Sequence, residues 1–386
     1  MTLKPIVTAT LLTAVLVSAD VKQDYKSIAQ ASNQFGLGYI NTAKKGNYFI
    51  SPVSISTAMA MTYAGAKGST AQEFEDVMHF NNTNGDFHEL NGLYQRELNK
   101  NLSALEWNLA NRLWGYGSSP FQEKFLEINK TLYNAPLQFG ASEETINTWV
   151  EQQTKGKIID LIPPGTITGD TRLILTNAVY FKGDWKYEFE KKATKKKDFF
   201  TPKAPVKVDM MFQKGGFSYY ENAKYQAVKL PYKGDKQSML VFLPKEEIGN
   251  VENDLNLTDI QTVLNSRNVN VNLHLPKFKL EYMEVFNGYL KGQGMTKAFG
   301  SGADFSGILT SESIWIDQVI HKSFVEVSEE GTEAAAATAV VMTTESMAQS
   351  KPKIIEFNAN KPFLFFIMDD SSGSILFMGK LENPNG

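Results

Sequence analysis

SEEGTEAAAATAVVMTTES, residues Ser328 to Ser346 of this 386-residue chain, has a composition that fits no ordinary secondary-structure element. Its four consecutive alanines follow Gly331-Thr332-Glu333, and local propensity alone predicts a short capped helix. The stretch has no apolar stripe at helical spacing, however, and it continues into the β-favouring Ala339-Val340-Val341. No proline from Gly331 to Lys351 removes a backbone donor. These features favour a strand that can enter an existing sheet.

Such a strand would carry small side chains on one face. With period-2 alternation, Thr332, Ala334, Ala336 and Thr338 share a face, and Glu333 points the other way into solvent. The first face is small enough to slide beneath packed elements. A slip of one residue would exchange the two faces. We interpret the stretch as a loop that can become a strand.

The run Phe324 to Thr338 closely resembles the hinge of inhibitory serpins, which are suicide-substrate protease inhibitors. Other serpin-like motifs follow the family's order along the chain: Phe49 to Ile55 (FISPVSI), Asn177 to Trp185 (NAVYFKGDW), Leu275 to Phe278 (LPKF), Pro362 to Ile367 (PFLFFI) and Phe377 to Lys380 (FMGK). Together they are specific. The resemblance implies an α+β serpin fold of three β-sheets and about nine helices, with an exposed reactive-centre loop over about residues 329–351.

The resemblance also implies a mechanism and a partner. In serpins a serine protease attacks the loop and forms an acyl-enzyme, and the hinge then inserts into the central sheet and distorts the attached protease. The hinge would comprise Glu329, Glu330, Gly331, Thr332, Glu333, Ala334, Ala335, Ala336, Ala337 and Thr338.

The family's count of fourteen residues after Gly331 places the reactive bond between Glu345 and Ser346. A trypsin-like pocket carries a carboxylate and would repel Glu345, whereas a pocket with Arg, Lys or His would accept it. Cleavage after Met342, Thr344 or Met347, by chymotrypsin-like or elastase-like enzymes, is the alternative.

Polar residues elsewhere match the serpin cluster beneath the strands that must separate: Ser51, Ser54, Asn177 and His321. A hydroxyl and amide network can hold two strands together and re-form after insertion. Trp185 and Glu329 resemble positions where insertion begins. Ordinary buried polar groups, and a core tryptophan, are the alternative reading.

Nothing in the sequence indicates an enzyme or a metal site. The four histidines lack metalloprotease spacing, there is no Gly-x-Ser-x-Gly elbow, and the chain contains no cysteine. Gly292-Gln293-Gly294 lacks the third glycine of a dinucleotide fingerprint and predicts a turn before a helix.

The N-terminus reads as a secretory signal over residues 1–19, in which Lys4 precedes the apolar run Ile6 to Val17 and cleavage follows Ala19. Residues 20–386 would then form one secreted domain. Four Asn-x-Ser/Thr acceptors are candidate glycan sites, of which we expect some to be used: Asn81, Asn101, Asn129 and Asn256. No later apolar stretch is long enough to span a membrane.

A formal net charge of -3 does not indicate a nucleic-acid partner. Lysines cluster in two neighbouring segments of the sequence: Lys155, Lys157, Lys186, Lys191, Lys192, Lys195, Lys196 and Lys197. They could bind a sulfated polysaccharide such as heparin, but a solvated face is the simpler interpretation, and no cofactor is required. The heparin-binding helix of some serpins has no counterpart, because residues 87–99 contain only Arg96 among Lys and Arg.

Local patterns predict a largely helical first half and strands thereafter. Helices are expected at 25–45, 55–66, 87–99 and 120–133, one begins at a Thr70-Glu73 capping box, and another is capped by Ser142. Strands are expected at 105–116, 173–181 and 269–275, with hairpins at 228–243 and 363–378. The style of the sequence resembles secreted arthropod serpins of immune cascades. A monomeric inhibitor is the main hypothesis, and a non-inhibitory carrier or chaperone is the alternative.

Overall fold

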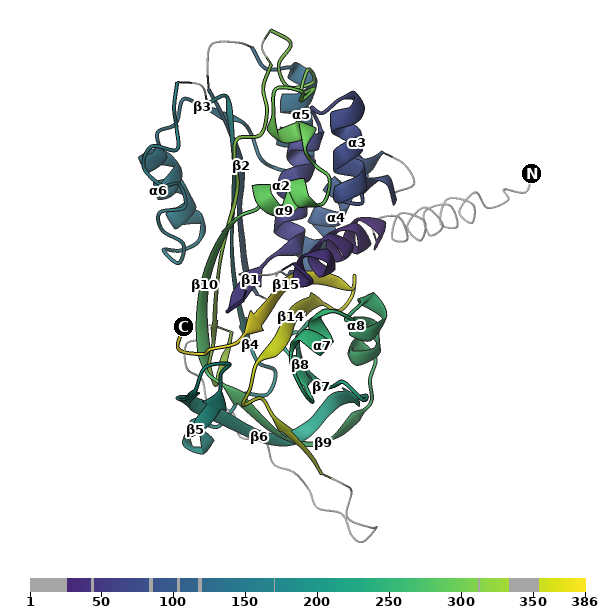
Figure 1. The fold of residues 1–386 in the computed structure, drawn as a ribbon, viewed down its shortest axis with the longest axis vertical. Coiled ribbons are helices and arrows are strands. Elements are labelled where there is room, and N and C mark those ends of the chain that lie inside the picture. Colours follow the sequence, from purple (N-terminus) through teal and green to yellow (C-terminus); the bar gives the residue numbers. More distant parts are fainter. Residues whose placement is uncertain are drawn as a thin grey trace, which may run out of the picture.

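The computed structural model describes residues 26–42, 45–82, 86–102, 105–116, 120–169, 171–311, 313–332 and 354–386. Most helices gather toward one end of the long axis, and the strands β5, β6 and β9 lie toward the other (Figure 1). No helix within these ranges is long and apolar enough to cross a membrane.

Nine α-helices occur in the described ranges. The first covers residues 26–40, and the others are α2 (Pro52–Tyr63), α3 (Gly68–Val77), α4 (Phe87–Asn101), α5 (Glu123–Leu132), α6 (Glu143–Gln153), α7 (Gly249–Glu252), α8 (Leu257–Leu264) and α9 (Asn287–Gly292). Several begin where the sequence offers a cap. The Ser142 hydroxyl accepts from the Thr145 amide at the start of α6, and Ser51 caps α2 ahead of Pro52.

The predicted capping box at Thr70 and Glu73 is wrong. Helix α3 begins at Gly68, and its N-cap Lys67 makes no side-chain cap bond. Thr70 Oγ1 instead accepts from the amide of Asp304 at 2.8 Å, and the Glu73 carboxylate accepts from the amide of Lys297 at 2.8 Å. Both side chains therefore satisfy backbone donors of a distant segment. Gly292 ends α9, and the turn at Gln293-Gly294 precedes the 3-10 helix η4 (Lys297–Phe299), so the predicted turn before a helix is confirmed.

A six-stranded sheet runs along the long axis in the order β10-β11-β12-β4-β2-β3 (Figure 1). Its strands are β2 (Glu106–Gly115), β3 (Gln138–Phe139), β4 (Leu173–Asp184), β10 (Phe278–Val285), β11 (Val319–Val327) and β12 (Gly331–Thr332). Helix α6 packs on one face through Ile146 and Val150, while α2 and the other sheet cover the opposite face. Strand β4 is buried on both faces, which explains its nearly continuous apolar run.

The remaining strands form a nine-stranded network in the order β1-β15-β14-β8-β7-β6-β9-β13, with β5 also paired to β6. They are β1 (Tyr48–Ile50), β5 (Lys195–Phe200), β6 (Pro205–Glu221), β7 (Tyr225–Pro231), β8 (Gln237–Pro244), β9 (Asn268–Pro276), β13 (Ile355–Asn358), β14 (Phe363–Asp369) and β15 (Ser374–Leu381). The three expected sheets thus appear as two hydrogen-bonded networks in the described chain. The long strand β6 pairs with β5, β7 and β9 and so joins two of them.

Strands β4 and β11 form a parallel pair at the centre of the six-stranded sheet. Their register runs from Val319 opposite Leu175 to Phe324 opposite Tyr180. Beyond Phe324 they separate, and the short strand β12 lies between them, antiparallel to both. The sheet is therefore closed along its middle and opened at one end by two residues of the predicted hinge.

Candidate functional site: the seated hinge and the central cluster

Gly331 and Thr332 are seated in the six-stranded sheet. Thr332 lies opposite Val327 of β11 and Gly183 of β4, and Gly331 lies opposite Asp184. A Cβ on Gly331 would stand 2.3 Å from the Gly183 carbonyl oxygen, so only glycine fits this close approach. The Thr332 side chain is fully buried, with its hydroxyl 2.7 Å from the Tyr232 hydroxyl. Thr332 therefore faces the interior, the face that the alternation assigns to it.

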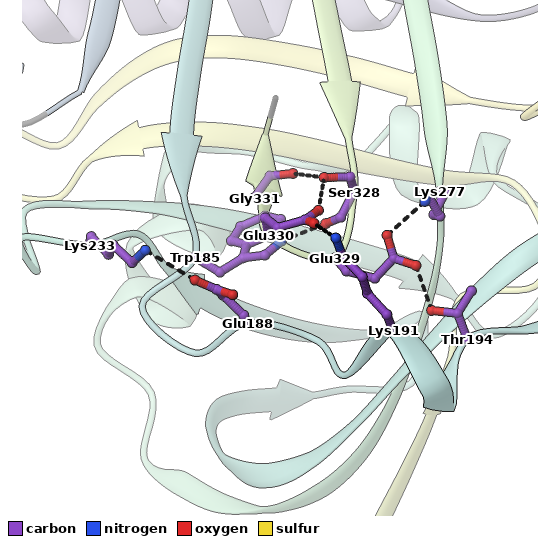
Figure 2. Close-up of polar contacts among 10 residues, drawn as sticks. All are labelled: Trp185, Glu188, Lys191, Thr194, Lys233, Lys277, Ser328, Glu329, Glu330 and Gly331. Carbon is purple, nitrogen blue, oxygen red and sulfur yellow. Dashed lines mark hydrogen bonds and ion pairs between the residues drawn. The ribbon is translucent and has the colours of Figure 1, made fainter. Parts of the chain in front are cut away.

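Two buried carboxylates hold the chain just before this strand (Figure 2). Glu329 is 5% exposed, and its carboxylate pairs with Lys277 Nζ at 2.7 Å and accepts from Thr194 Oγ1 at 2.8 Å. Glu330 pairs with Lys191 and accepts from Ser328 Oγ at 3.0 Å. We name these contacts the hinge clasp: Glu329 with Lys277 and Thr194, and Glu330 with Lys191.

The ion pairs set the ionisation of the clasp. Burial alone would raise the pKa of Glu329, but Lys277 and Thr194 outweigh it and hold that pKa below its ordinary value. Burial acts on Glu330 in the same way, and Lys191 and Ser328 lower its pKa. Both carboxylates are ionised at neutral pH, and each faces a lysine.

Backbone contacts complete the seat. The Trp185 amide donates to the Glu330 carbonyl at 2.9 Å, and the Phe189 amide donates to the Glu329 carbonyl at 2.8 Å. The Trp185 indole Nε1 donates to the Ser328 carbonyl at 3.0 Å, and its ring stacks on Tyr232 at 4.7 Å between centroids. Trp185 is thus both a core residue and a direct support of the hinge backbone.

The structure brings Ser51, Ser54, Asn177 and His321 together on the face of the β4–β11 pair that α2 covers. Asn177 and His321 are direct register partners across that pair. The Ser51 hydroxyl donates to the Leu376 carbonyl at 2.7 Å, and Asn177 Nδ2 donates to Ser54 Oγ at 2.6 Å. Sequence reasoning missed a fifth member, Asn111 of β2, whose Oδ1 accepts from Asn177 Nδ2 at 2.7 Å. We name these five residues the central cluster.

His321 is neutral in this cluster. The Ser51 amide donates to His321 Nε2 at 3.2 Å, so Nε2 is an acceptor and the ring proton lies on Nδ1. Nδ1 then donates to Asn177 Oδ1. Burial lowers the pKa of His321 to about 3, because a charged ring would lose its hydration. The bond from His321 to Asn177 is a side-chain link between the two central strands.

Part of the predicted site lies outside the described residues. This holds for residues 1–19 and for the loop positions Glu333, Ala334, Ala335, Ala336, Ala337, Thr338, Glu345 and Ser346. The seated hinge covers Glu329 to Thr332 of the predicted range.

Asn129 must be withdrawn as a glycan site. Its side chain is fully buried, and its Nδ2 donates to the carbonyls of Phe125 and Met61 at 3.0 and 3.3 Å, so the amide nitrogen is enclosed. Asn81 and Asn256 are exposed, and Asn256 also caps α8 through its Oδ1. Asn101 is half-buried and donates to Ser371 Oγ at 2.8 Å, a bond that a glycan on the same nitrogen would disturb.

The predicted polyanion-binding lysines do not form one patch. Lys155 and Lys157 follow α6, whereas Lys191, Lys192, Lys195, Lys196 and Lys197 lie in or beside β5, well apart along the long axis (Figure 1). Lys155 pairs with Glu106 at 2.5 Å, and the Lys157 ammonium lies over the Phe324 ring. Within the described ranges, no group of three or more His, Cys, Asp or Glu side chains could hold a metal ion.

The fold and the site define a protein whose six-stranded sheet holds Gly331 and Thr332 between two strands that pair directly along the rest of their length. The chain belongs to the serpin family, because the family model "Serpin (serine protease inhibitor)" matches residues 30–384. A leukocyte elastase inhibitor of Xenopus tropicalis is 42% identical over 358 residues, covering 88% of this chain and 93% of that protein. A serpin-like protein of Thermococcus kodakarensis is 40% identical over 376 residues, covering 93% and 86%.

Solved structures agree with this assignment. The crystal structure of Serpin48 from the insect Tenebrio molitor superposes with a TM-score of 0.78 and 31% identity over 95% of this chain and 98% of that one. The predicted serpin fold is therefore confirmed.

Proposed function

We propose that this protein is a suicide-substrate inhibitor of a serine protease. The register of β12 is the observation that carries the proposal. Thr332 already opposes Val327 and Gly183, antiparallel to both neighbours. A strand that kept this register would bring Ala335 opposite Phe324 and Tyr180, which now pair directly with each other. It would bring Thr338 opposite His321 and Asn177, which also pair directly now.

Insertion of this strand would therefore exchange one ladder for two. The parallel β4–β11 ladder would be replaced by antiparallel ladders on both sides of the new strand, and antiparallel pairing is slightly more stable per residue. Alternation would turn Ala334, Ala336 and Thr338 to the buried face that Thr332 already uses. All four side chains on this face, two alanines and two threonines, are small, so they fit beneath a packed sheet.

The central cluster gives Thr338 a role in the inserted state. Separation of β4 from β11 breaks the bond from His321 Nδ1 to Asn177 Oδ1. The Thr338 hydroxyl would enter between those two side chains and can both donate and accept a hydrogen bond. In this proposal a bond across the strand pair is exchanged for bonds to the inserted strand.

The protease enters through an exposed bond, which we place at Glu345–Ser346. A carboxylate bait suits a pocket that contains a cation. Cleavage after Met342, Thr344 or Met347 is the alternative, and a relative named for elastase inhibition gives it weight. The proposal has three further parts. Residues 1–19 direct secretion, Asn81 or Asn256 carries a glycan, and the protein acts as a monomer in an arthropod immune cascade. Inhibition requires no cofactor.

Incubation of the secreted protein with serine proteases of differing pocket charge tests the proposal. Denaturing gels should show a covalent complex, and mass spectrometry should show a released peptide that begins at Ser346. A complex with a different new N-terminus would keep the mechanism and move the bond. Cleavage without a complex by every protease, with no gain in thermal stability afterwards, would instead favour a carrier or chaperone of the same fold.

A further inference from the structure

The segment from Lys191 to Lys207 is strongly basic. It contains seven lysines and one acidic residue, Asp198. It comprises the short helix η3 (Lys191–Ala193), strand β5 and the turn into β6. Strand β5 pairs only with β6 among the described strands, and five of its six residues are exposed. The charge is therefore displayed on an edge strand.

Three of these lysines are neutralised by ion pairs. Lys191 pairs with Glu330 of the hinge clasp, Lys196 with Asp209 at 3.0 Å, and Lys207 with Asp198 at 2.9 Å. By contrast, Lys192, Lys195, Lys197 and, in the turn after β5, Lys203 are exposed and make no ion pair with a carboxylate in the described part of the chain. The Lys197 ammonium lies 3.2 Å from His274 Nδ1, a neutral acceptor. We name Lys192, Lys195 and Lys197 the basic ridge.

The segment that carries the ridge touches the chain on both sides of the reactive loop. At its start, Lys191 and Thr194 contact Glu330 and Glu329, immediately before β12. At its end, the Phe200 amide donates to the Asn360 carbonyl at 2.8 Å, just after β13. The chain on either side of the residues between β12 and β13 is therefore held against the segment that carries this ridge.

We infer that the basic ridge is a docking surface for the protease that attacks the loop, and that it selects enzymes with an acidic surface beside the active-site cleft. The inference rests on the proposed function. Unpaired exposed lysines attract such a surface before contact is made, and this raises the association rate more than the final affinity. The loop then provides the bond that is cut, and the ridge discriminates between proteases whose specificity pockets are of the same type.

A sulfated polysaccharide is the other polyanion that exposed lysines could bind, and the structure favours it less. The lysines after α6 lie away from the ridge, so they do not extend it into one long basic track. The ridge lies between the two loop-flanking contacts of its segment, which is the position expected for a second contact with a loop-bound protein.

Two trypsins with the same pocket and opposite surface charge provide the test. A Glu345→Arg background gives both enzymes a bait, and the probes are anionic trypsin and cationic trypsin. The ridge variant is Lys192→Gln/Lys195→Gln/Lys197→Gln. The matched control, Lys67→Gln/Lys124→Gln/Lys130→Gln, removes the same charge from exposed positions before α3 and on α5. The readouts are the rate of covalent-complex formation and the stoichiometry, each in low and high salt.

The inference requires anionic trypsin to react about tenfold more slowly with the ridge variant at low salt, with unchanged stoichiometry. The loss should shrink in about 1 M salt, where charges are screened, and cationic trypsin and the control variant should show no such loss. Equal rates for ridge and control variants would overturn it. So would lysine-dependent heparin binding without a change in trypsin rates, which assigns the ridge to a polysaccharide. No covalent complex with either trypsin refutes the proposed inhibition itself.

Discussion

The pair between Lys277 and Glu329 should hold the hinge in the sheet. The Glu329 side chain is 6% exposed and the Lys277 side chain is 39% exposed, so the carboxylate is the more desolvated partner. Removal of one partner from a buried ion pair costs about 3–5 kcal/mol, because the other charge stays buried. The half-solvated lysine reduces this, and we expect Lys277→Met to weaken the seat by about 2 kcal/mol.

Glu329→Gln should cost less, about 1 kcal/mol or below, because the amide keeps the bond from Thr194 and leaves no buried charge. The double variant should resemble Glu329→Gln alone, which corresponds to a coupling energy of about 2 kcal/mol, the full effect of Lys277→Met. Hydrogen exchange of peptides that cover residues 184–190 and 327–332 measures the opening directly. A loss of about 2 kcal/mol appears as roughly 30-fold faster exchange when opening is in rapid equilibrium.

Lys233→Met is the matched control. Lys233 pairs with Asp184 and Glu188 at 3.2 and 3.1 Å at the same end of β4, but it does not contact the hinge (Figure 2). If Lys277→Met accelerates exchange no more than Lys233→Met does, the reasoning about the clasp is refuted. A coupling energy near zero in the double-mutant cycle would refute it equally.

Thr332→Arg should turn the inhibitor into a substrate, because it forces a charge into a fully buried position. A rise in the stoichiometry of inhibition measures this change, and Thr332→Ser, which keeps the hydroxyl, is the control. Burial holds the pKa of His321 at about 3, below its ordinary value, so the unfolded chain binds this proton at a higher pH than the folded protein does. The free energy of unfolding should therefore be insensitive to this histidine above about pH 6.5 and should fall between there and about pH 3, by up to about 1.4 kcal/mol per pH unit. Urea unfolding at pH 7 and pH 5 checks this, and a His321→Gln variant with an identical pH dependence would contradict it. Peptide mass spectrometry should find no glycan at Asn129, and a glycan there would show that glycosylation precedes the folding of α5.

Much of the fold could be predicted from local patterns. Helices α4 and α6 begin at Phe87 and Glu143, where Asp86 and Ser142 supply caps that can be read from a few residues. The long apolar run of β4 also indicates a strand buried on both faces. Such features depend on near neighbours in the sequence, so a single sequence suffices to find them.

The hinge clasp could not be predicted in this way. Lys277 lies between β9 and β10, within the motif Leu275 to Phe278, but that motif does not reveal Glu329 as its partner. Thr194 lies beside β5, and nothing in its local pattern distinguishes it from other threonines. Asn111 is likewise one polar residue in a strand, and its place in the central cluster follows only from its register opposite Asn177. Thr70 and Glu73 show the converse. Their spacing fits a capping box, but their side chains instead accept hydrogen bonds from backbone amides more than 200 residues away.

The two parts of the site would control different stages of the proposed insertion. The hinge clasp acts at the end of the sheet where β4 and β11 have already separated, so it governs whether the incoming strand keeps its first two residues in place. The central cluster acts where the two strands are still paired. Ser51 caps α2, and it bonds to Leu376 of β15 and, through its amide, to His321 of β11. Ser54 of α2 accepts from Asn177 of β4, so the two serines hold both central strands to the layer beneath them. The His321 to Asn177 bond crosses the pair, and in the proposed insertion it would have to break before residues beyond Thr332 could enter. A variant of the clasp should therefore change the native position of the hinge, whereas a variant of His321 should change the rate at which insertion continues past it.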